Sequence, residues 1–423
     1  MSRIAVVGTG YVGLTTGAYM AHLGHDVVCA DVVSGKVERL SRGEIPIFEV
    51  GLEDLVREGI TTRRLSFVLG AATAVDGAEF IFLCLPTPQG EDGSADTSYV
   101  RAAAEEIGPL LRPEAVVVNK STLPVGSTRM VEQVLGRTDV HVVSNPEFLR
   151  EGSAVYDCLH PDRIVIGSVD PAAATRVARL FERLEAPVII TDPVSAEAIK
   201  YASNAFLATK VSFVNAMANL CEAVGADVRE VVLGMGYDKR IGFEFLRPGP
   251  GWGGSCFPKD TQALIRIGDD HGYDFSLLRG VVAVNKEQCE RVVAKVERLA
   301  GGSLDGVTVG AWGLAFKAGT DDTRDSPAVE VVHRLQDRGA AVRAYDPAAA
   351  PVGLDRITRV DDPYAACENA AVLVVLTEWD EFKWLDLNKV RSLMAHPCIV
   401  DGRNLLDPAV ARRKGFTYEG LGR

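Results

Sequence analysis

The segment RIAVVGTGYVG at residues 3–13 constrains the fold of this chain more than any other feature. A short apolar run leads into Gly8-x-Gly10-x-x-Gly13, and a helical stretch follows directly. Glycines in this spacing permit a tight turn and a close backbone approach, and the helix N-terminus can face a pyrophosphate. Asp31 ends the next apolar run, where a carboxylate would accept hydrogen bonds from ribose hydroxyls. The segment therefore predicts a dinucleotide-binding β-α-β unit, and the acid favours NAD over NADP.

Strand-like apolar runs alternate with helical patterns over residues 1 to about 190. Near-continuous runs of Val, Ile and Leu are typical of strands buried on both faces, so the alternation favours a parallel, doubly wound sheet. The expected strands are residues 3–8, 26–31, 80–86, 115–121 and 140–146.

A second block of the same kind begins near residue 306. Its turn has Gly310 and Gly313 but no complete fingerprint, and Trp312 and Phe316 would crowd a pyrophosphate. We therefore expect this half to bind a different ligand in a similar position. The expected strands are 306–317, 340–347, 370–379 and 396–406.

A long helix is predicted over residues 192–225, between the two blocks. Asp192 is a good N-cap, Pro193 suits the first helical position, and Gly225 is a plausible stop. Few positions are charged, so we expect a central connector that also packs against a second subunit. Its apolar residues at helical spacing are Phe206, Phe213, Met217, Leu220 and Val224. The fold class is thus α/β, with two Rossmann-like doubly wound domains joined by a long central helix.

Composition excludes several classes of function. The formal charge is −12 over 423 residues and no Lys/Arg-rich run occurs, which argues against nucleic-acid binding. No apolar run approaches the length of a membrane span, and the first residues lack a signal-peptide cleavage site. The eight cysteines are dispersed without a C-x-x-C pair, so we expect no metal site and reduced thiols in the cytoplasm.

The run GPGWGGSCFPKD at residues 249–260 places Cys256 behind four glycines. The simplest interpretation is a buried thiol in a turn. The flanks suit a core poorly, because glycines free the backbone to wrap a ligand and Lys259 and Asp260 bring charge. A nearby cation or helix N-terminus would favour the nucleophilic thiolate, so the run predicts a catalytic thiol.

Other polar residues lie at strand ends or inside the apolar helix, where capping and function are both open. Lys200 and Asn204 are spaced i, i+4 and share one helix face. Glu147 and Glu151 repeat that spacing. The segments PTP at 86–88 and KSTLPVGST, which holds Ser121 and Thr122, follow predicted strands, whose carboxyl ends face the ligand crevice of an open α/β sheet.

Eight motifs in order resemble the UDP-glucose/GDP-mannose dehydrogenase family over essentially the whole chain. They are GTGYVG, PTP, KSTLPVGST, NPEFLREG, KYASNAFLA, GGSCFPKD, GLAFKAGTDDTRDSP and DGR. The resemblance implies a four-electron oxidation of a sugar-nucleotide primary alcohol to a carboxylate, with two NAD reduced. It also explains the thiol, because an aldehyde intermediate would form a thiohemiacetal with Cys256, then a thioester, which water releases as the acid.

The resemblance implies a role for each matching position. Cys256 matches the nucleophile, and Lys200 with Asn204 the group that polarises the oxyanion. Asp260 resembles the residue that orients water or manages protons. Glu147 resembles a glutamate that transfers protons through a water supported by Thr122. The positions that match cofactor contacts are Gly8, Gly10, Tyr11, Val12, Gly13, Asp31, Lys36, Thr87, Ser121, Glu151 and Arg324. Those that match substrate contacts are Phe148, Leu149, Lys200, Asn204, Arg240, Phe245, Leu246, Gly253, Lys317 and Arg403.

The resemblance also implies an organisation and a substrate. It gives an NAD-binding domain at 1–191, a central domain at 192–300 that dimerises and carries the cysteine loop, and a UDP-sugar-binding domain at 301–423. Arg240 matches an arginine that reaches the neighbouring subunit's site, so the smallest active unit would be a dimer or a higher homo-oligomer. The runs around Arg240 and Cys256 favour UDP-glucose over GDP-mannose or another UDP-hexose. A plain two-electron dehydrogenase and a non-catalytic NAD or nucleotide-sugar sensor are the alternatives from other classes.

Overall fold

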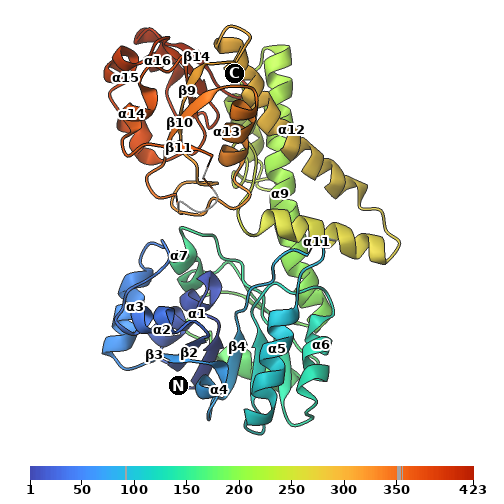
Figure 1. The fold of residues 1–423 in the computed structure, drawn as a ribbon. Coiled ribbons are helices and arrows are strands. Elements are labelled where there is room, and N and C mark those ends of the chain that lie inside the picture. The colour runs from blue at the N-terminus through green and yellow to red at the C-terminus, as the bar shows by residue number, and fades with distance from the viewer. Residues whose placement is uncertain (91–92, 350–353, 355) are drawn as a thin grey trace. The chain divides into compact units, whose positions relative to one another are not determined.

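The computed structural model describes residues 1–90, 93–349, 354 and 356–423. It divides into two compact units, each built on its own sheet (Figure 1). The first unit comprises Met1–Ser203 and Gln262–His271, and the second comprises Asn204–Thr261 and Gly272–Arg423. The predicted fold class, α/β with two Rossmann-like sheets and a helical middle, is confirmed.

The sheet of the first unit has eight strands in the order β3-β2-β1-β4-β5-β6-β7-β8. Neighbouring strands pair in parallel except β6 with β7, which are antiparallel. The order reverses at β1, and the crevice at such a switch point is where open α/β sheets bind ligands. The strands are β1 Arg3–Val7, β2 Asp26–Asp31, β3 Leu65–Leu69, β4 Phe80–Leu83, β5 Val116–Asn119, β6 His141–Ser144, β7 Ile164–Gly167 and β8 Val188–Thr191.

Helices cover both faces of this sheet (Figure 1). One core packs α1, α3, α7 and α8 against the sheet, and the other packs α4, α5 and α6 against its opposite face. Strands buried on both faces explain the continuous apolar runs of the sequence. The helices are α1 Tyr11–His22, α2 Ser34–Ser41, α3 Leu52–Thr61, α4 Ala71–Ala74, α5 Ser98–Ile107, η1 Gly108–Leu110, α6 Ser127–Leu135, α7 Ala154–Leu159 and α8 Pro171–Arg179.

The predicted central helix is α9, Pro193–Val224, and the division between the two units falls within it. Asp192 caps its start, since its Oδ1 accepts the Ser195 N–H at 2.9 Å. Gly225 follows the end with a φ of +75°, a left-handed conformation that glycine adopts without strain. The other helices of the middle of the chain are α10 Val228–Gly236, α11 Phe257–Asp270 and α12 Ser276–Leu299.

The sheet of the second unit is parallel, in the order β11-β10-β9-β12-β13-β14. Helices α12 and α13 pack on one face, and α14, η2, α15 and α16 pack on the other. The strands are β9 Thr308–Trp312, β10 Ala341–Tyr345, β11 Thr358–Arg359, β12 Val372–Val375, β13 Cys398–Asp401 and β14 Thr417–Glu419. The helices are α13 Pro327–Asp337, α14 Pro363–Cys367, η2 Asp380–Trp384, α15 Leu387–Leu393 and α16 Pro408–Arg413.

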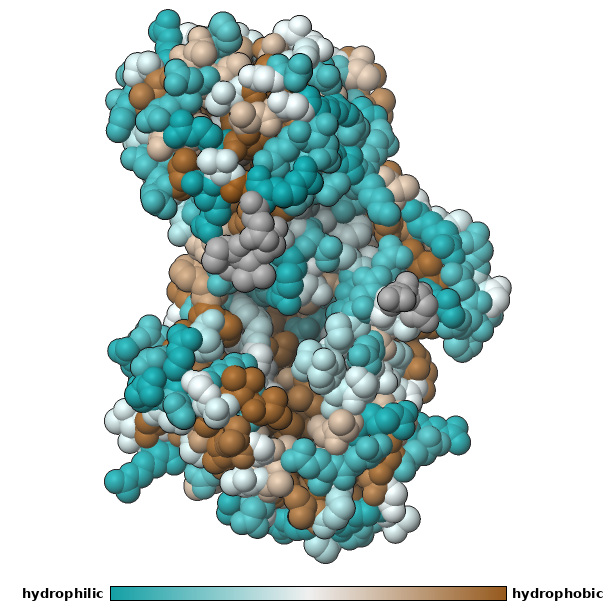
Figure 2. Space-filling view, viewed as in Figure 1, coloured by the Kyte–Doolittle hydropathy of each residue, from teal (hydrophilic) through white to brown (hydrophobic). Residues whose placement is uncertain are grey.

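The surface of each unit is mostly hydrophilic in the face that Figure 2 shows, with scattered apolar patches. The apolar stripe of α9 is a marked exception in the single chain, since the side chains of Phe206 and Phe213 are 65% and 49% exposed. Leu220 and Val224 continue the stripe at 52% and 68%. None of the helices that the structure describes is both long and apolar enough to cross a membrane.

Candidate active site

The turn between β1 and α1 has the geometry that the glycine fingerprint predicts. Gly8 has a φ of +95°, and a Cβ there would lie 2.4 Å from the Cys84 carbonyl oxygen. A Cβ on Gly13 would lie 1.9 Å from the Gly8 carbonyl oxygen, so the helix packs directly on the turn. At Gly10, which precedes α1, a Cβ would meet nothing within 4 Å. The first and third glycines are therefore required by packing, and the second leaves the open approach that a pyrophosphate needs.

Asp31 ends β2 beside this turn, at the position where the fingerprint predicts an acidic residue that binds the ribose hydroxyls. Its Oδ2 accepts from the Thr9 N–H at 3.2 Å, the Thr9 hydroxyl at 2.5 Å and the Lys36 ammonium at 2.9 Å. Burial alone would raise the pKa of Asp31, but these bonds and one from the Val33 N–H lower it to about 2. The carboxylate is thus ionised at neutral pH, and it fits a dinucleotide ribose just as the open approach at Gly10 fits the pyrophosphate.

Tyr11 and Val12, the next two predicted cofactor residues, lie in the first turn of α1. Val12 packs against the apolar core, and the Tyr11 hydroxyl donates to the carboxylate of Glu49. Glu49 also accepts from the Gly152 N–H at 2.7 Å, which joins α1 to the segment that holds Glu151. Glu49 is a buried charge that the sequence analysis missed.

The loops that follow β4 and β5 are joined through Ser121. Its hydroxyl donates to the Leu85 carbonyl at 2.8 Å and accepts from the Leu85 N–H at the same distance. Thr87 lies buried in the first loop, and Thr122 follows Ser121 in the second. These three predicted residues therefore lie at the carboxyl edge of the sheet, as expected.

Glu147 and Lys200 form a buried ion pair, with Oε1 and Nζ 2.6 Å apart and side chains 5% and 3% exposed. Burial alone would raise the pKa of Glu147, but Lys200, the Leu149 N–H and nearby Lys120 together hold it below its ordinary value. Glu147 Oε2 accepts that N–H at 2.6 Å, while the Leu149 side chain packs against the core. The ring centroid of Phe148 lies 5.5 Å from Lys200 Nζ.

The spacing argument for Glu147 and Glu151 was wrong, because residues 145–150 form no helix and the two do not share a helix face. Lys200 pairs with Glu147 from a different part of the chain, and no local pattern could have shown it. Lys120 was also missed. It is buried, donates to Asn145 Oδ1 at 3.1 Å, and has a pKa that burial lowers.

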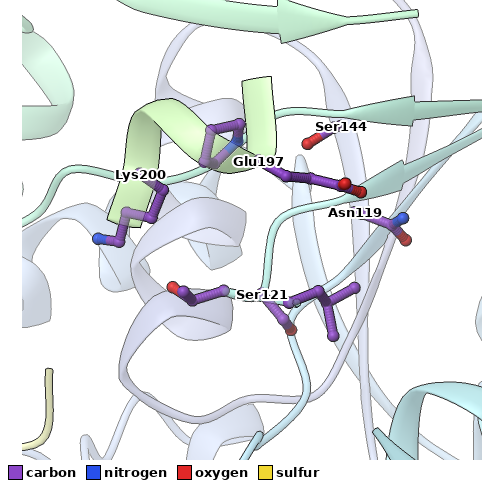
Figure 3. A pocket seen from close by; sticks show the side chains of 8 residues that line it. Asn119, Ser121, Ser144, Glu197 and Lys200 are labelled. Carbon is purple, nitrogen blue, oxygen red and sulfur yellow. The ribbon is translucent and has the colours of Figure 1, made fainter. Parts of the chain in front are cut away.

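A small cavity lies among the ends of β5, β6 and the start of α9, with about 10 Å³ of room for the centre of a water molecule (Figure 3). In Figure 3 the Glu197 side chain extends toward the side where Asn119 lies, and the Lys200 side chain extends the other way. Both polar side-chain atoms of Asn119 are buried without a partner among the residues that the structure describes. The cavity is lined by Asn119, Ser121, Thr122, Leu123, Ser144, Pro146, Glu197 and Lys200.

Glu197, one turn before Lys200, is a further buried carboxylate that the sequence analysis missed. It accepts the Gly126 N–H at 2.5 Å, the Thr128 N–H at 2.8 Å and the Thr128 hydroxyl at 2.7 Å. Burial nevertheless raises its pKa. Because these donors begin α6, Glu197 fixes the first turns of α9 against the loop that holds Thr122.

In the second unit, Asn204 and Asp260 are hydrogen-bonded. Asn204 Nδ2 donates to Asp260 Oδ2 at 2.6 Å, and the Lys259 ammonium donates to Asp260 Oδ1 at 2.6 Å. The Asp260 side chain is 1% exposed. Asn204 lies one turn after Lys200 on α9, as predicted, but its observed partner is this carboxylate.

Cys256 immediately precedes α11, and its carbonyl accepts the Asp260 N–H at 2.9 Å. Asp260 therefore lies one helical turn after Cys256. The Ser255 hydroxyl lies 3.5 Å from Cys256 Sγ. Among the eight cysteines only Cys256 and Cys398 are partly exposed, and the others are buried as core residues. Cys256 therefore lies at the N-terminal boundary of α11, where the backbone dipoles of a helix stabilise negative charge.

Three predicted substrate residues lie between positions 245 and 253, before the cysteine. Phe245 has a φ of +61°, which is rare for an aromatic residue and costs about 1–3 kcal/mol of strain. Leu246 is buried beside it. Gly253 is required by packing, because a Cβ there would lie 2.0 Å from the Asp325 carbonyl oxygen.

The predicted arginines and lysine of the second unit differ in their surroundings. Arg403 is largely buried, and its guanidinium donates to the carbonyls of Leu376 and Phe316 at 2.8 Å each. Lys317 Nζ lies 5.8 Å from the Phe316 ring centroid. By contrast, Arg240 and Arg324 are exposed and pair with Asp238 and Asp322, respectively, over short N–O distances of 2.6 and 2.7 Å.

Trp312 does not crowd the second glycine turn, which corrects our expectation. Its side chain is fully buried, stacks on Phe382 and donates to the Pro363 carbonyl at 2.9 Å. The side chain therefore points into the core, because successive strand residues alternate between the two faces. Gly313 remains closely packed, since a Cβ there would lie 2.3 Å from Thr377 Cβ.

Three models of one family match the chain in order. The NAD binding domain of the UDP-glucose/GDP-mannose dehydrogenase family matches residues 2–185, its central domain 194–287, and its UDP binding domain 310–408. A UDP-glucose 6-dehydrogenase of Pseudomonas aeruginosa is 46% identical over 100% of this chain and 97% of the relative. UDP-glucose 6-dehydrogenase TuaD of Bacillus subtilis is 45% identical over 100% and 94%. The structure of a UDP-glucose dehydrogenase from Pyrobaculum islandicum matches with a TM-score of 0.92 and 40% identity, covering 100% of this chain and 98% of that one.

Proposed function

The chain belongs to the UDP-glucose/GDP-mannose dehydrogenase family, and on that premise we propose that it oxidises UDP-glucose to UDP-glucuronate. The observation that carries the four-electron reaction is the partly exposed Cys256 thiol at the start of α11, one turn before Asp260. A single alcohol oxidation needs no nucleophile. A second oxidation at the same carbon does, because the aldehyde carbon must first form a new bond to a nucleophile, which makes it tetrahedral and leaves a hydrogen that can depart as hydride.

Cys256 supplies that bond. Its sulfur adds to the aldehyde carbon and the thiol proton ends on the oxygen, giving a thiohemiacetal without a change in oxidation state. The second oxidation turns this adduct into a thioester, and water breaks the C–S bond to release the acid and the thiol. NAD, when bound, accepts one hydride in each oxidation, so two are reduced per sugar. The covalent bond also keeps a reactive aldehyde from leaving.

The buried polar groups have defined tasks in this proposal. The Lys200 ammonium and the Asn204 amide stabilise the negative oxygen of the reacting carbon. Glu147, which already bonds Lys200, exchanges protons through a water that the Thr122 hydroxyl supports. Asp260, which the Lys259 ammonium keeps paired, orients the hydrolytic water.

The ligand-binding roles are proposed by position. Residues 1–191 would hold NAD, 192–300 would present Cys256 and join subunits, and 301–423 would bind the UDP moiety. The proposed NAD contacts are Gly8, Gly10, Tyr11, Val12, Gly13, Asp31, Lys36, Thr87, Ser121, Glu151 and Arg324. The proposed sugar-nucleotide contacts are Phe148, Leu149, Lys200, Asn204, Arg240, Phe245, Leu246, Gly253, Lys317 and Arg403.

We propose that the active unit contains at least two chains, with Arg240 acting in the partner's site. The exposed apolar stripe of α9 supports this, because Phe206, Phe213, Leu220 and Val224 would be covered by a second copy. Arg240 is 89% exposed in the single chain, so its guanidinium is available to a neighbour. A cytoplasmic location is proposed because the cysteines are dispersed and form no disulfide.

UDP-glucose is preferred to the rival sugars because both curated relatives described above carry that name. The test is the initial rate of NADH formation with UDP-glucose, GDP-mannose and other UDP-hexoses at equal concentration. The proposal expects the highest kcat/KM with UDP-glucose. A higher kcat/KM for GDP-mannose would instead indicate a GDP-mannose dehydrogenase. No reduction of NAD with any of these sugars would favour a non-catalytic sensor.

A further inference from the structure

The glycine-rich loop, residues 249–255, carries the chain to Cys256 without helix or strand. Residues 249–254 are nevertheless buried. Buried backbone N–H and C=O groups need hydrogen-bond partners, and a loop that lacks a ladder must find them in side chains. The side-chain partners of this loop come from α9 and α12, and one backbone partner comes from Arg324.

Asn285, on α12, makes the two backbone hydrogen bonds that a neighbouring strand would otherwise make. Its Oδ1 accepts the Trp252 N–H at 2.8 Å, and its Nδ2 donates to the Trp252 carbonyl at 2.9 Å. One amide thus satisfies both backbone groups of one loop residue. The fit is close, because a Cβ on Gly251 would lie 2.8 Å from Asn285 Oδ1 and Gly251 itself has a φ of +140°.

Helix α9 holds the same part of the loop from a second direction. The Ser212 hydroxyl accepts from Trp252 Nε1 at 2.9 Å, and Asn215 Oδ1 accepts the Gly249 N–H at 2.9 Å. Further along, the Gly254 N–H donates to the Arg324 carbonyl at 3.0 Å. The loop is therefore held by hydrogen bonds up to two residues before Cys256. Among the bonds described, Trp252 makes more of them than any other loop residue.

We infer that Asn285 is a positioning residue for Cys256, acting through Trp252. The inference rests on the proposed function. A nucleophile must lie within about 3–3.5 Å of the carbon it attacks, and a displacement of 1 Å can cost on the order of a hundredfold in rate. If Asn285 no longer holds Trp252, the thiol reaches the aldehyde less often, and the aldehyde leaves before the second oxidation.

The experiment is NADH formed per UDP-glucose consumed, with released aldehyde trapped by hydroxylamine, for wild type and Asn285→Ala. The matched control is Asn219→Ala, since Asn219 Nδ2 also bridges α9 and α12, to Gln288 Oε1 at 3.0 Å, and this bond does not involve the loop. In the proposal Asn285→Ala lowers kcat at least about tenfold, changes KM less, and releases aldehyde with fewer than two NADH per sugar. Asn219→Ala keeps two NADH per sugar without trapped aldehyde.

Two NADH per sugar in Asn285→Ala, whether the rate is unchanged or merely reduced, would overturn the inference. A purely structural role would lower the fraction of active enzyme without separating the first oxidation from the second. Circular dichroism and NADH titration establish that the variant is folded. If it is not, Asn285→Asp carries the test, since it keeps the acceptor for the Trp252 N–H and loses only the donor. Failure of wild type to form two NADH would contradict the proposed function instead, so the two failures are distinguishable.

Discussion

The Lys200 ammonium and the Glu147 carboxylate lie 2.6 Å apart, with both side chains almost completely removed from water. Burying one charge without its partner costs several kcal/mol, so each group fixes the charge state of the other. The pair also places a cation and a proton acceptor side by side in a protein that must stabilise an oxyanion and move protons. Its first consequence is that changes to either residue affect stability and turnover together, and the two effects have to be separated.

Lys200→Met should lower kcat by about a hundred- to a thousandfold, the usual loss when an oxyanion donor is removed. NAD affinity, measured by equilibrium titration, should stay nearly unchanged. Lys210→Met is the matched control on the same helix, because Lys210 donates only to the Ile241 carbonyl among the bonds described, and it should retain turnover. A folded Lys200→Met protein that no longer binds NAD would show that Lys200 is structural.

The same variant makes a pH prediction. In wild type the pKa of Glu147 is lowered, so its contribution to stability is present above the unfolded-state pKa and is lost as pH falls through the folded-state value. Without Lys200 burial dominates and that pKa rises, so the variant should gain stability relative to wild type as pH falls from 7 toward 5. Thermal unfolding at several pH values measures this. The double variant Lys200→Met, Glu147→Gln should recover stability without turnover.

Asp260→Asn should leave hydride-transfer residues intact but slow release of the acid, since the Asp260 carboxylate orients the hydrolytic water in the proposal. Loss of a general acid–base group costs about a hundred- to ten-thousandfold. Rapid mixing should then show a burst of NADH followed by slow turnover. Asp270→Asn, at the other end of α11 and paired with Arg266, is the control. A lower rate of NADH formation in every phase, without a burst, would show that Asp260 acts before the thioester forms.

Much of the fold followed from local pattern, and the exceptions are mostly edge strands. Strands β1, β2, β4, β5 and β6 are buried on both faces and read as apolar runs. Strand β8 lies at the sheet edge, with Val188, Ile189 and Ile190 all at least 41% exposed, and its short apolar run is not among the expected strands. Strand β11 is two residues long and carries no periodicity at all.

The residues of the candidate site also divide into those that local sequence could predict and those that it could not. The glycine turn, Asp31 and the order Cys256 then Asp260 are local and could be predicted. Glu197 could not, because its donors Gly126 and Thr128 lie about seventy positions earlier. Asn285 and Trp252 are likewise distant in sequence. Polar residues in helices have many uses, and only the folded chain shows which backbone group each one meets.

Asp31→Asn should weaken NAD binding about tenfold or more, since hydrogen bonds to a charged acceptor are worth ~1.5–3 kcal/mol. The pKa of Asp31 is about 2, so the carboxylate stays ionised and should give no change in NAD affinity between pH 8 and 5. Its contribution to stability should be lost only as pH falls from about 4 through about 2. Asp26→Asn, at the start of the same strand, is the control. A step in affinity between pH 5 and 7 that Asp31→Asn abolishes would contradict the lowered pKa.

Mixing two inactive variants tests whether Arg240 acts across a subunit interface. Arg240→Ala and Cys256→Ser should each be nearly inactive alone. If Arg240 serves the partner's site, a mixed dimer has one site with both an intact Cys256 and an intact Arg240, so random exchange should restore about a quarter of wild-type turnover. No recovery after verified exchange would place Arg240 in its own subunit's site.

The covalent role of Cys256 is tested most directly by counting NADH per UDP-glucose consumed in wild type and Cys256→Ser side by side. The account predicts two NADH and free UDP-glucuronate from wild type. It predicts that Cys256→Ser stalls after partial oxidation, because a serine ester hydrolyses poorly, and mass spectrometry should find the sugar attached to the protein. One NADH with free aldehyde from wild type, or full turnover with two NADH from Cys256→Ser, would contradict it.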